Sequence, residues 1–281
     1  MPESVLRFAP SPNGHLHLGH AYSALFTEVW AKRLGGTMLL RLEDTDPTRC
    51  KPEFAEAILE DLRWLGLDWP EPVMVQSTRF AIYAAHADRL RELGLLYPCF
   101  CARSEVAAHA VGLDPDGAPL YGGTCRHLSP QIVAERLERG DPVQYRLDGG
   151  KAIGLAGPLT FTLAQPTPLD RPQIRYARPE VWGDVVIQRK STPTSYHLSV
   201  VVDDAAQGIT HVTRGRDMEP STEIHVLLQM LLNLPQPLYT FHKLILGPDG
   251  RKLSKSQHSP SLRELRTSGQ TAAEIRAGLG F

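Results

Sequence analysis

A strand, a broken turn and a helix open the chain, and this order limits the folds available to it. The apolar run at 5–9 predicts a strand, which two prolines and a glycine at 10–14 interrupt, because proline fixes φ and glycine permits close backbone approach. Apolar residues then recur every four positions over 21–34, which predicts a helix. A second apolar run at 37–42 predicts another strand. Two strands joined by a helix indicate a parallel sheet of an α/β fold.

Two histidines lie at the start of that helix, in the tetrapeptide His17-Leu18-Gly19-His20. The first turn of a helix carries free backbone N–H groups and the positive end of the helix dipole, so it favours phosphate. Two imidazoles three positions apart can both donate to phosphate oxygens. Alone, the tetrapeptide does not exclude an ordinary βα turn with incidental histidines.

A second motif, Lys252-Leu253-Ser254-Lys255-Ser256, follows a turn at 247–250 near the other end of the chain. Its lysines supply compact positive charge, which suits a triphosphate whose leaving pyrophosphate develops negative charge. A basic loop by itself is usually a solvated surface. The two motifs in this order, bracketing nearly the whole chain, are far more specific than either one.

Together the two motifs resemble the His-Ile-Gly-His and Lys-Met-Ser-Lys-Ser signatures of the class I aminoacyl-tRNA synthetases. The resemblance implies a Rossmann-like catalytic domain that binds ATP with Mg²⁺ and activates an amino acid. It assigns catalytic roles to His17, His20, Lys252 and Lys255, and ATP binding to His17, Gly19, His20 and Lys255.

Four further segments resemble the glutamate-specific synthetases of this class. They are Arg-Phe-Ala-Pro-Ser-Pro at 7–12, Arg-Leu-Glu-Asp-Thr-Asp at 41–46, Pro-Thr-Ser-Tyr-His at 193–197, and the stretch 200–215, which begins Val-Val-Val-Asp-Asp. In that family the equivalent positions contact the amino acid, and the resemblance carries this role to Arg7, Phe8, Ala9, Pro10, Ser11, Glu43, Tyr196 and Arg214.

The charges of these residues fit L-glutamate independently of the resemblance. Glutamate has two carboxylates and one ammonium group. Arg7 and Arg214 are suited to grip carboxylates through paired hydrogen bonds, and Glu43 is suited to the ammonium. Tyr196 offers a hydroxyl for further selection. The alternative is that Arg7 is an ordinary strand-end arginine and Glu43 a salt-bridge partner.

The composition is that of an ordinary soluble globular protein, with 42% hydrophobic and 22% charged residues. The longest apolar runs are too short to span a bilayer, and the first residues lack an export signal, so we expect a cytoplasmic protein without a membrane partner or disulfides. The net charge of −1 argues against a bulk polyelectrolyte binder. A basic excess in the second half permits a local nucleic-acid face, and a scattered solvated surface is the alternative.

The periodicity weakens between 98 and 176, where proline, glycine and aspartate accumulate. We therefore predict residues 1–97 as the first half of the catalytic domain, 98–176 as an insertion, and 177–281 as the second half with the lysine motif. Within this frame the pattern predicts helices at 52–67, 78–93, 129–140 and 222–232. It predicts strands or core segments at 185–188, 196–202 and 209–213. In the helix at 129–140, Ile132, Val133 and Leu137 are expected to face inward.

Three of the four cysteines, Cys99, Cys101 and Cys125, lie in that insertion, whereas Cys50 lies apart in a charged loop and has no expected role. A loop-rich segment gains stability from a metal clip, and three thiolates suit tetrahedral Zn²⁺. The insertion is thus predicted to be a small zinc-binding α+β subdomain. His127 and Tyr121 are both possible fourth ligands, and three free buried cysteines are the alternative to a metal site.

Twenty-five residues follow Ser256, whereas a full glutamyl-tRNA synthetase continues into a helical anticodon-binding region. In this respect, and in its cysteine spacing, the chain resembles the glutamyl-queuosine tRNA(Asp) synthetases. These attach glutamate to queuosine in the anticodon of tRNA(Asp), which implies the tRNA(Asp) anticodon arm as partner. In that family a tyrosine is the fourth zinc ligand, which implies the set Cys99, Cys101, Tyr121 and Cys125.

Three rival functions remain. The chain could be a shortened glutamyl-tRNA synthetase that charges 3′ ends, or a nucleotidylyltransferase of the same superfamily that acts on a small molecule. It could also be an inactive synthetase paralogue that serves as an RNA-binding module. The intact motif residues speak against the last of these, and activity decides it.

Overall fold

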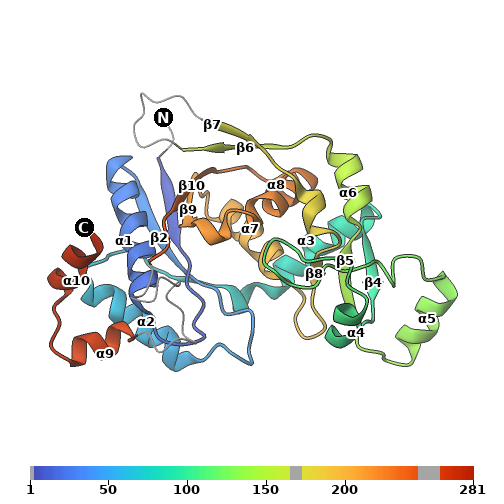
Figure 1. The fold of residues 1–281 in the computed structure, drawn as a ribbon, viewed down its shortest axis with the longest axis horizontal. Helices are drawn as coiled ribbons and strands as arrows, with labels where there is room; N and C mark the ends of the chain where they lie inside the picture. Colours follow the sequence, from blue (N-terminus) through green and yellow to red (C-terminus); the bar gives the residue numbers. More distant parts are fainter. Residues whose placement is uncertain (1–2, 165–172, 246–259) are drawn as a thin grey trace.

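The opening strand–helix–strand unit forms as the sequence predicts in the computed structural model, which describes residues 3–164, 173–245 and 260–281 (Figure 1). β1 (Val5–Phe8) and β2 (Thr37–Leu42) pair in parallel, and α1 (Leu18–Arg33) packs against both. β3 (Met74–Val75) continues this sheet in parallel to β2. The chain returns tightly at Gly36, where a side chain would collide with the Ser4 carbonyl oxygen.

A second sheet continues the first. It contains β7 (Gln173–Tyr176), β6 (Thr160–Leu163), β10 (Leu238–His242) and β9 (His211–Gly215), in that order, with only β7 antiparallel. β9 lies beside β1, because the Thr210 N–H donates to the Val5 carbonyl oxygen at 2.9 Å. The strand order therefore changes direction between β1 and β9. In α/β sheets ligands bind at the carboxyl ends of the strands at such a point.

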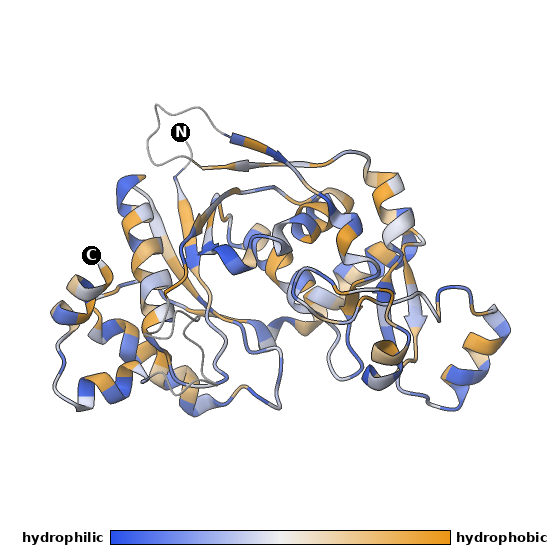
Figure 2. Ribbon diagram, viewed as in Figure 1, coloured by the Kyte–Doolittle hydropathy of each residue, from blue (hydrophilic) through white to orange (hydrophobic). Residues whose placement is uncertain are grey.

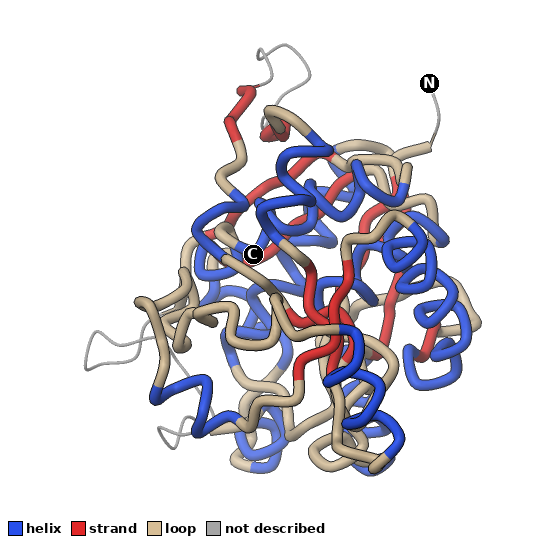
Figure 3. Tube along the Cα trace, turned by 90° about the vertical axis from the view of Figure 1, so that its right-hand side faces the viewer, coloured by secondary structure: helices blue, strands red, loops and turns tan. Residues whose placement is uncertain are grey.

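Helices lie on both sides of these strands (Figure 3). α7 (Tyr196–Ala206) packs against α3 (Phe80–Glu92) and α8 (Ser221–Leu232), while α10 (Ala272–Leu279) packs against α1. The remaining elements near this part of the fold are α2 (Pro52–Trp64), α9 (Leu262–Thr267), and the 3₁₀ helices η1 (Gln76–Arg79), η2 (Pro179–Trp182) and η3 (Arg216–Met218). None of the helices in the described ranges is long and apolar enough to cross a membrane.

The run at 196–202, predicted as a strand or a core segment, is the first part of helix α7, so the strand alternative is wrong. Ser195 caps the helix, and its hydroxyl accepts from the Leu198 N–H. Residues 198–204 are all buried between neighbouring elements. A helix buried on nearly all sides has no polar face, so its apolar run cannot be told from a buried strand by periodicity.

A third, antiparallel sheet contains β4 (Leu96–Cys99), β5 (Gln144–Leu147) and β8 (Val186–Gln188). The short helices α4 (Arg103–Ala108), α5 (Pro130–Glu138) and α6 (Gly149–Ala156) accompany it. Strand pairing joins the predicted segments, since β8 pairs with β5 of the predicted insertion and β6 pairs with β10. The division at residues 97 and 176 stays a prediction.

α5 begins after Ser129 and ends before Gly140, as the sequence predicts, but Ile132 and Leu137 do not face inward, and Val133 is half-buried. Ile132 is 43% exposed and Leu137 42% exposed. The helix lies at the edge of the molecule, where Figure 2 shows hydrophobic positions on it. The inward orientation is therefore wrong for Ile132 and Leu137, because periodicity shows that a helix has an apolar face but not whether another element covers it.

Candidate active site

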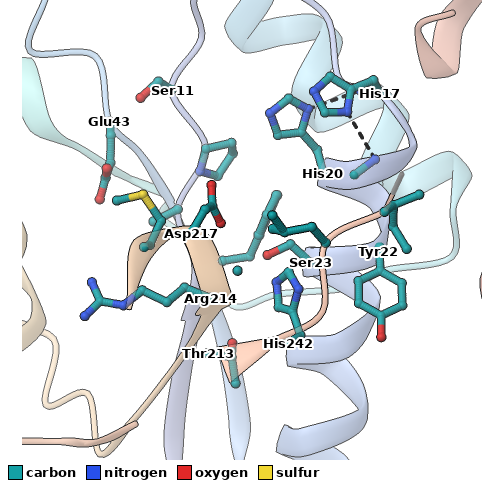
Figure 4. A pocket seen from close by; sticks show the side chains of 18 of the residues that line it. Ser11, His17, His20, Tyr22, Ser23, Glu43, Thr213, Arg214, Asp217 and His242 are labelled. Atoms are coloured by element: carbon teal, nitrogen blue, oxygen red, sulfur yellow. Dashed lines mark hydrogen bonds between the residues drawn. The ribbon is translucent and has the colours of Figure 1, made fainter. Parts of the chain in front are cut away.

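A cavity of about 690 Å³ lies at the carboxyl ends of β1 and β9, beside the start of α1; we call it the main cavity (Figure 4). It is therefore at the point where the strand order changes direction. The predicted site residues that line it are Arg7, Phe8, Ala9, Pro10, Ser11, His17, Gly19, His20, Glu43, Tyr196 and Arg214. The fold thus brings together all of the predicted glutamate- and ATP-contacting residues that lie in the described ranges.

The two histidines of the first motif are fixed by the cap of α1. The Gly19 N–H donates to His17 Nδ1 at 3.1 Å, and the His17 N–H donates to His20 Nδ1 at 3.2 Å. The two ring centroids are 3.9 Å apart. Because each Nδ1 accepts a hydrogen bond, each neutral ring carries its proton on Nε2. Both rings are therefore N–H donors beside the positive end of the helix.

Gly19 is required for this arrangement of His17. A Cβ at this position would lie 2.9 Å from Cε1 and 3.1 Å from Nδ1 of the His17 ring. These distances are shorter than ordinary van der Waals contact, so any larger residue would displace the imidazole. Gly19 thus leaves the space that the His17 imidazole occupies.

Three buried charged residues, Arg7, Arg41 and Asp204, form a network with the half-buried Glu43 at the wall of the main cavity; we call it the charge network. Arg7 Nε lies 3.0 Å from Asp204 Oδ1, and Arg41 NH1 lies 2.8 Å from the same oxygen. Arg41 NH2 lies 3.1 Å from Glu43 Oε1. The positive charges of two guanidinium groups therefore balance the negative charges of two carboxylates. Arg41 and Asp204 are not among the predicted site residues, although an aspartate within the apolar run at 198–204 is a signal that a buried cation pairs with it.

The pKa shifts within the charge network follow from burial and pairing. Burial raises the pKa of Asp204, but Arg7 and Arg41 outweigh this and lower it overall. Burial lowers the pKa of Arg41, but Asp204 and Glu43 more than reverse this. For Glu43 burial dominates and raises the pKa, although Arg41 and Arg7 oppose it. Arg7 and Glu43 thus have partners inside the protein, as the alternative interpretation expected, and both also line the main cavity.

Arg214 differs from Arg7, because no carboxylate pairs with it anywhere in the described ranges. Its NH1 lies 3.2 Å from His225 Nδ1, its NH2 donates to the Thr222 hydroxyl, and its Nε is buried without a hydrogen-bond partner. The guanidinium lies 5.4 Å from the ring centroid of Tyr239 and 5.7 Å from that of Phe241. A buried cation at the wall of a cavity, without an acidic partner, indicates a site for an anion.

A second cavity of about 220 Å³ adjoins the first and shares Ser11, Asn13, Glu43 and Tyr196 with it. Its other lining residues include Asp46, Arg49, Cys50 and Arg189. Burial is the main cause that lowers the pKa of Arg189, and the cations Arg49 and Arg103 add to it. Cys50, for which the sequence predicts no role, therefore lies beside the site.

The second motif falls outside the described residues, so Lys252 and Lys255 have no described position. The chain on either side of it lies at the site. Leu244 and Ile245 line the main cavity, and the Leu262 N–H donates to the Leu16 carbonyl oxygen at 2.8 Å, one residue before His17.

Cys99, Cys101 and Cys125 come together as predicted, with their sulfur atoms all within 4.8 Å of one another. The Tyr121 hydroxyl lies 3.4 Å from Cys99 Sγ and 3.7 Å from Cys101 Sγ. We call these four residues the cysteine cluster. Three thiols and a phenol oxygen around one point are a donor set suited to Zn²⁺.

The cluster is supported by cationic and polar neighbours. Arg146 Nε donates to Cys99 Sγ at 3.4 Å, and its guanidinium lies 3.9 Å from the Tyr121 ring centroid. Burial raises the pKa of the Cys99 thiol, but its hydrogen bonds with Tyr121, Arg146 and Gln144 outweigh this and lower the pKa to about 7. A lower thiol pKa favours the thiolate, which is the form of cysteine that binds a metal ion.

The family model "tRNA synthetases class I (E and Q), catalytic domain" matches residues 4–279. The chain therefore belongs to this family of class I aminoacyl-tRNA synthetases, and it is an enzyme of the ligase kind. Among its relatives, the glutamyl-Q tRNA(Asp) synthetase of Rhodobacter capsulatus is 42% identical over 99% of this chain and 100% of its own length. The glutamate–tRNA ligase of Aquifex aeolicus is 39% identical over 96% of this chain and 55% of its own.

The solved structure of a glutamate–tRNA synthetase from Elizabethkingia anophelis superposes with a TM-score of 0.73 at 28% identity, over 95% of this chain and 54% of that one. The chain thus spans about half the length of the glutamate–tRNA ligases that it matches. The α/β catalytic-domain fold predicted from the sequence is confirmed.

Proposed function

We propose that the protein activates L-glutamate with ATP and transfers the glutamyl group to queuosine in the anticodon of tRNA(Asp). The observation that carries the activation step is the main cavity. It combines two imidazole N–H donors at a helix N-terminus with Arg214, whose charge has no acidic partner among the described residues. The first feature suits phosphate and the second suits a carboxylate.

In the activation step the α-carboxylate of glutamate attacks the α-phosphorus of ATP, and pyrophosphate leaves. His17 and His20 donate their Nε2–H groups to phosphate oxygens, and the start of α1 adds its dipole. ATP enters as its Mg²⁺ complex, and the sequence assigns Lys252 and Lys255 to the leaving phosphates. Arg214 holds a substrate carboxylate, and the charge network fixes Arg7 and Glu43 at the cavity wall.

In the transfer step a hydroxyl of the queuosine cyclopentenediol attacks the acyl carbon of glutamyl-adenylate, and AMP leaves. The second cavity meets the first at Glu43 and Tyr196, which offers the acceptor a path to the acyl group. No covalent enzyme intermediate is needed. Positioning of the two reactants and preorganised charge account for the catalysis.

The cysteine cluster has the donors for one structural Zn²⁺, with Cys99, Cys101, Cys125 and Tyr121 as ligands. The metal would hold residues 99–125 together and would take no part in the reaction. Geometry supports Tyr121 as the fourth ligand, since its hydroxyl lies against two of the thiols.

Full-length similarity to relatives named glutamyl-Q tRNA(Asp) synthetase favours queuosine as acceptor. A second candidate is 3′-end charging, which the similarity to glutamate–tRNA ligases favours. Both functions require glutamyl-adenylate and differ only in the acceptor.

Glutamate-dependent exchange of pyrophosphate into ATP tests the first step. We expect exchange with glutamate and far less with glutamine or aspartate, because glutamine lacks one carboxylate charge and aspartate is one methylene shorter. Comparable exchange with glutamine would contradict the assignment of Arg214.

The acceptor is tested with tRNA(Asp) that carries queuosine but lacks its 3′-terminal adenosine. We expect full glutamylation of this RNA, and of an isolated anticodon stem-loop with queuosine. The matched control is the same truncated tRNA with guanosine in place of queuosine, which should accept nothing. Loss of glutamylation on removal of the 3′ adenosine would replace this proposal by 3′-end charging.

A further inference from the structure

The guanidinium of Arg214 is held by a shell of uncharged groups. His225 Nδ1 lies 3.2 Å from NH1, the Thr222 hydroxyl accepts from NH2, and the rings of Tyr239 and Phe241 cover the group. Arg214 is only 7% exposed. Figure 4 shows Arg214 on the same side of the main cavity as Glu43, opposite His17 and His20.

His225 is itself held by a second histidine. His225 Nε2 lies 3.3 Å from Nδ1 of His197. The His197 ring packs edge-on against Trp182, at 5.4 Å between centroids, and Tyr196 lies near both imidazoles. His225 comes from α8 and His197 from the first turn of α7, so packing of the two helices fixes the pair.

The two hydrogen bonds that link Arg214, His225 and His197 can run in only one direction. A guanidinium only donates, so His225 Nδ1 is an acceptor and its ring proton lies on Nε2. That proton is donated to His197 Nδ1, so His197 carries its own proton on Nε2. Both imidazole rings must therefore be neutral for these two hydrogen bonds to form.

The surroundings keep both rings neutral. Burial lowers the pKa of His225 well below its usual value, and Arg214, His197 and Arg7 add to the effect. Burial also lowers the pKa of His197 to about 4, with Arg214 and Arg189 adding to it. No carboxylate contacts either imidazole in the described ranges. Among Arg214, His225 and His197, only Arg214 is therefore charged, and no ion pair in the described part of the chain neutralises its charge.

We infer that His225 is a positioning residue for glutamate: by accepting from NH1 of Arg214 it fixes the plane of the guanidinium, and His197 fixes His225 in turn. The guanidinium of Arg214, which lines the main cavity, then stays oriented for a substrate carboxylate. The inference rests on the proposed function, because it concerns the amino acid of that reaction. If the guanidinium were free to rotate, Arg214 would keep its charge but lose oriented hydrogen bonds to the substrate carboxylate.

The test compares two polar substitutions of similar size. His225→Asn places its side-chain oxygen near the position of Nδ1, so it retains an acceptor for Arg214. His225→Gln extends to the position of Nε2, so it retains the contact with His197 and loses the one with Arg214. In pyrophosphate exchange we expect His225→Gln to raise KM for glutamate on the order of 10-fold. We expect kcat and KM for ATP to change less than about 2-fold, and His225→Asn to stay close to the wild-type enzyme.

The control is His211→Gln, since His211 is a half-buried imidazole of β9 that contacts Thr210 and does not line the main cavity. It should leave all constants unchanged. A general structural role of His225 would instead lower kcat with both variants, or raise KM for ATP together with that for glutamate. Equal KM for glutamate in the Asn and Gln variants would overturn the inference. If the wild-type enzyme shows no glutamate-dependent exchange, the proposed function itself fails, which is a separate result.

Discussion

The charge network and the cysteine cluster are both built from polar side chains, but the chain assembles them in opposite ways. Arg7 and Arg41 meet Asp204 across 197 and 163 positions of sequence. In the cysteine cluster, Cys101 contacts Tyr121 and Cys125 across 20 and 24 positions. One site therefore requires the whole sheet to form, whereas the other requires only a local loop to close.

The apolar packing around the charge network is also more extensive than that around the cysteine cluster. Asp204 belongs to α7, whose buried residues pack in the large apolar core with those of α3 and α8. The buried core around the cysteine cluster consists of Cys99, Phe100, Tyr121 and Cys125 alone, among the described residues. Damage to the charge network should therefore spread through the fold, while damage to the cysteine cluster should stay local.

The largest effect is expected for Asp204→Ala. The variant leaves Arg7 and Arg41 without their shared carboxylate in a buried position, so the free energy of unfolding should fall by about 3 to 5 kcal/mol. Urea denaturation measures it. Asp88→Ala is the control, because its ion pair with Arg91 is exposed and should contribute less than about 1 kcal/mol. Similar losses for both variants would mean that Asp204 contributes no more to stability than an exposed ion pair.

The second effect is a loss of stability in mild acid. The pKa of His197 is about 4 in the folded protein and 6.5 is its ordinary value, so between these limits the unfolded chain binds a proton that the folded protein does not. Stability should therefore fall as the pH drops from 6.5 to 4, by on the order of 2 kcal/mol from this residue. Chemical denaturation at several pH values should show a shallower slope for His197→Phe than for wild type. An unchanged slope would mean that His197 is not buried as a neutral ring.

A third effect concerns activity with little change in stability. Gly19→Ala displaces the His17 ring from the cap of α1, so pyrophosphate exchange should fall on the order of 10-fold. Gly278→Ala is the matched control in α10, where an added Cβ meets no atom within 4 Å. Equal exchange rates in the two variants would show that the position of His17 does not matter for catalysis.

The smallest effect on global stability is expected for Cys125→Ser. Zinc content should fall from about one per chain, and residues 98–128 should become sensitive to protease. The main unfolding transition should move by less than about 1 kcal/mol, because this small core contributes little to the rest. Metal analysis and limited proteolysis measure both. A zinc-free wild-type protein purified without chelator, or global unfolding of the variant, would be inconsistent with a local zinc site.

The sequence by itself determined the features that depend on near neighbours. The strand–turn–helix at the start of the chain, the histidines at the cap of α1 and the meeting of three cysteines all follow from turn chemistry, capping and short spacing. Arg7, Glu43, Tyr196 and Arg214 could be collected into one site only through the resemblance to a family, because nothing local connects them.

Tertiary structure alone decided the partners of the buried charges and the covering of apolar faces. The sequence could not show that Asp204 joins Arg7 to Arg41, that residues 196–202 form a helix, or that α5 leaves Ile132 exposed. It also could not show that His225 holds Arg214. The physical reason is that a buried charge must find a partner wherever the fold brings one, and an apolar face can be covered by any element that reaches it. Neither choice is encoded in local periodicity.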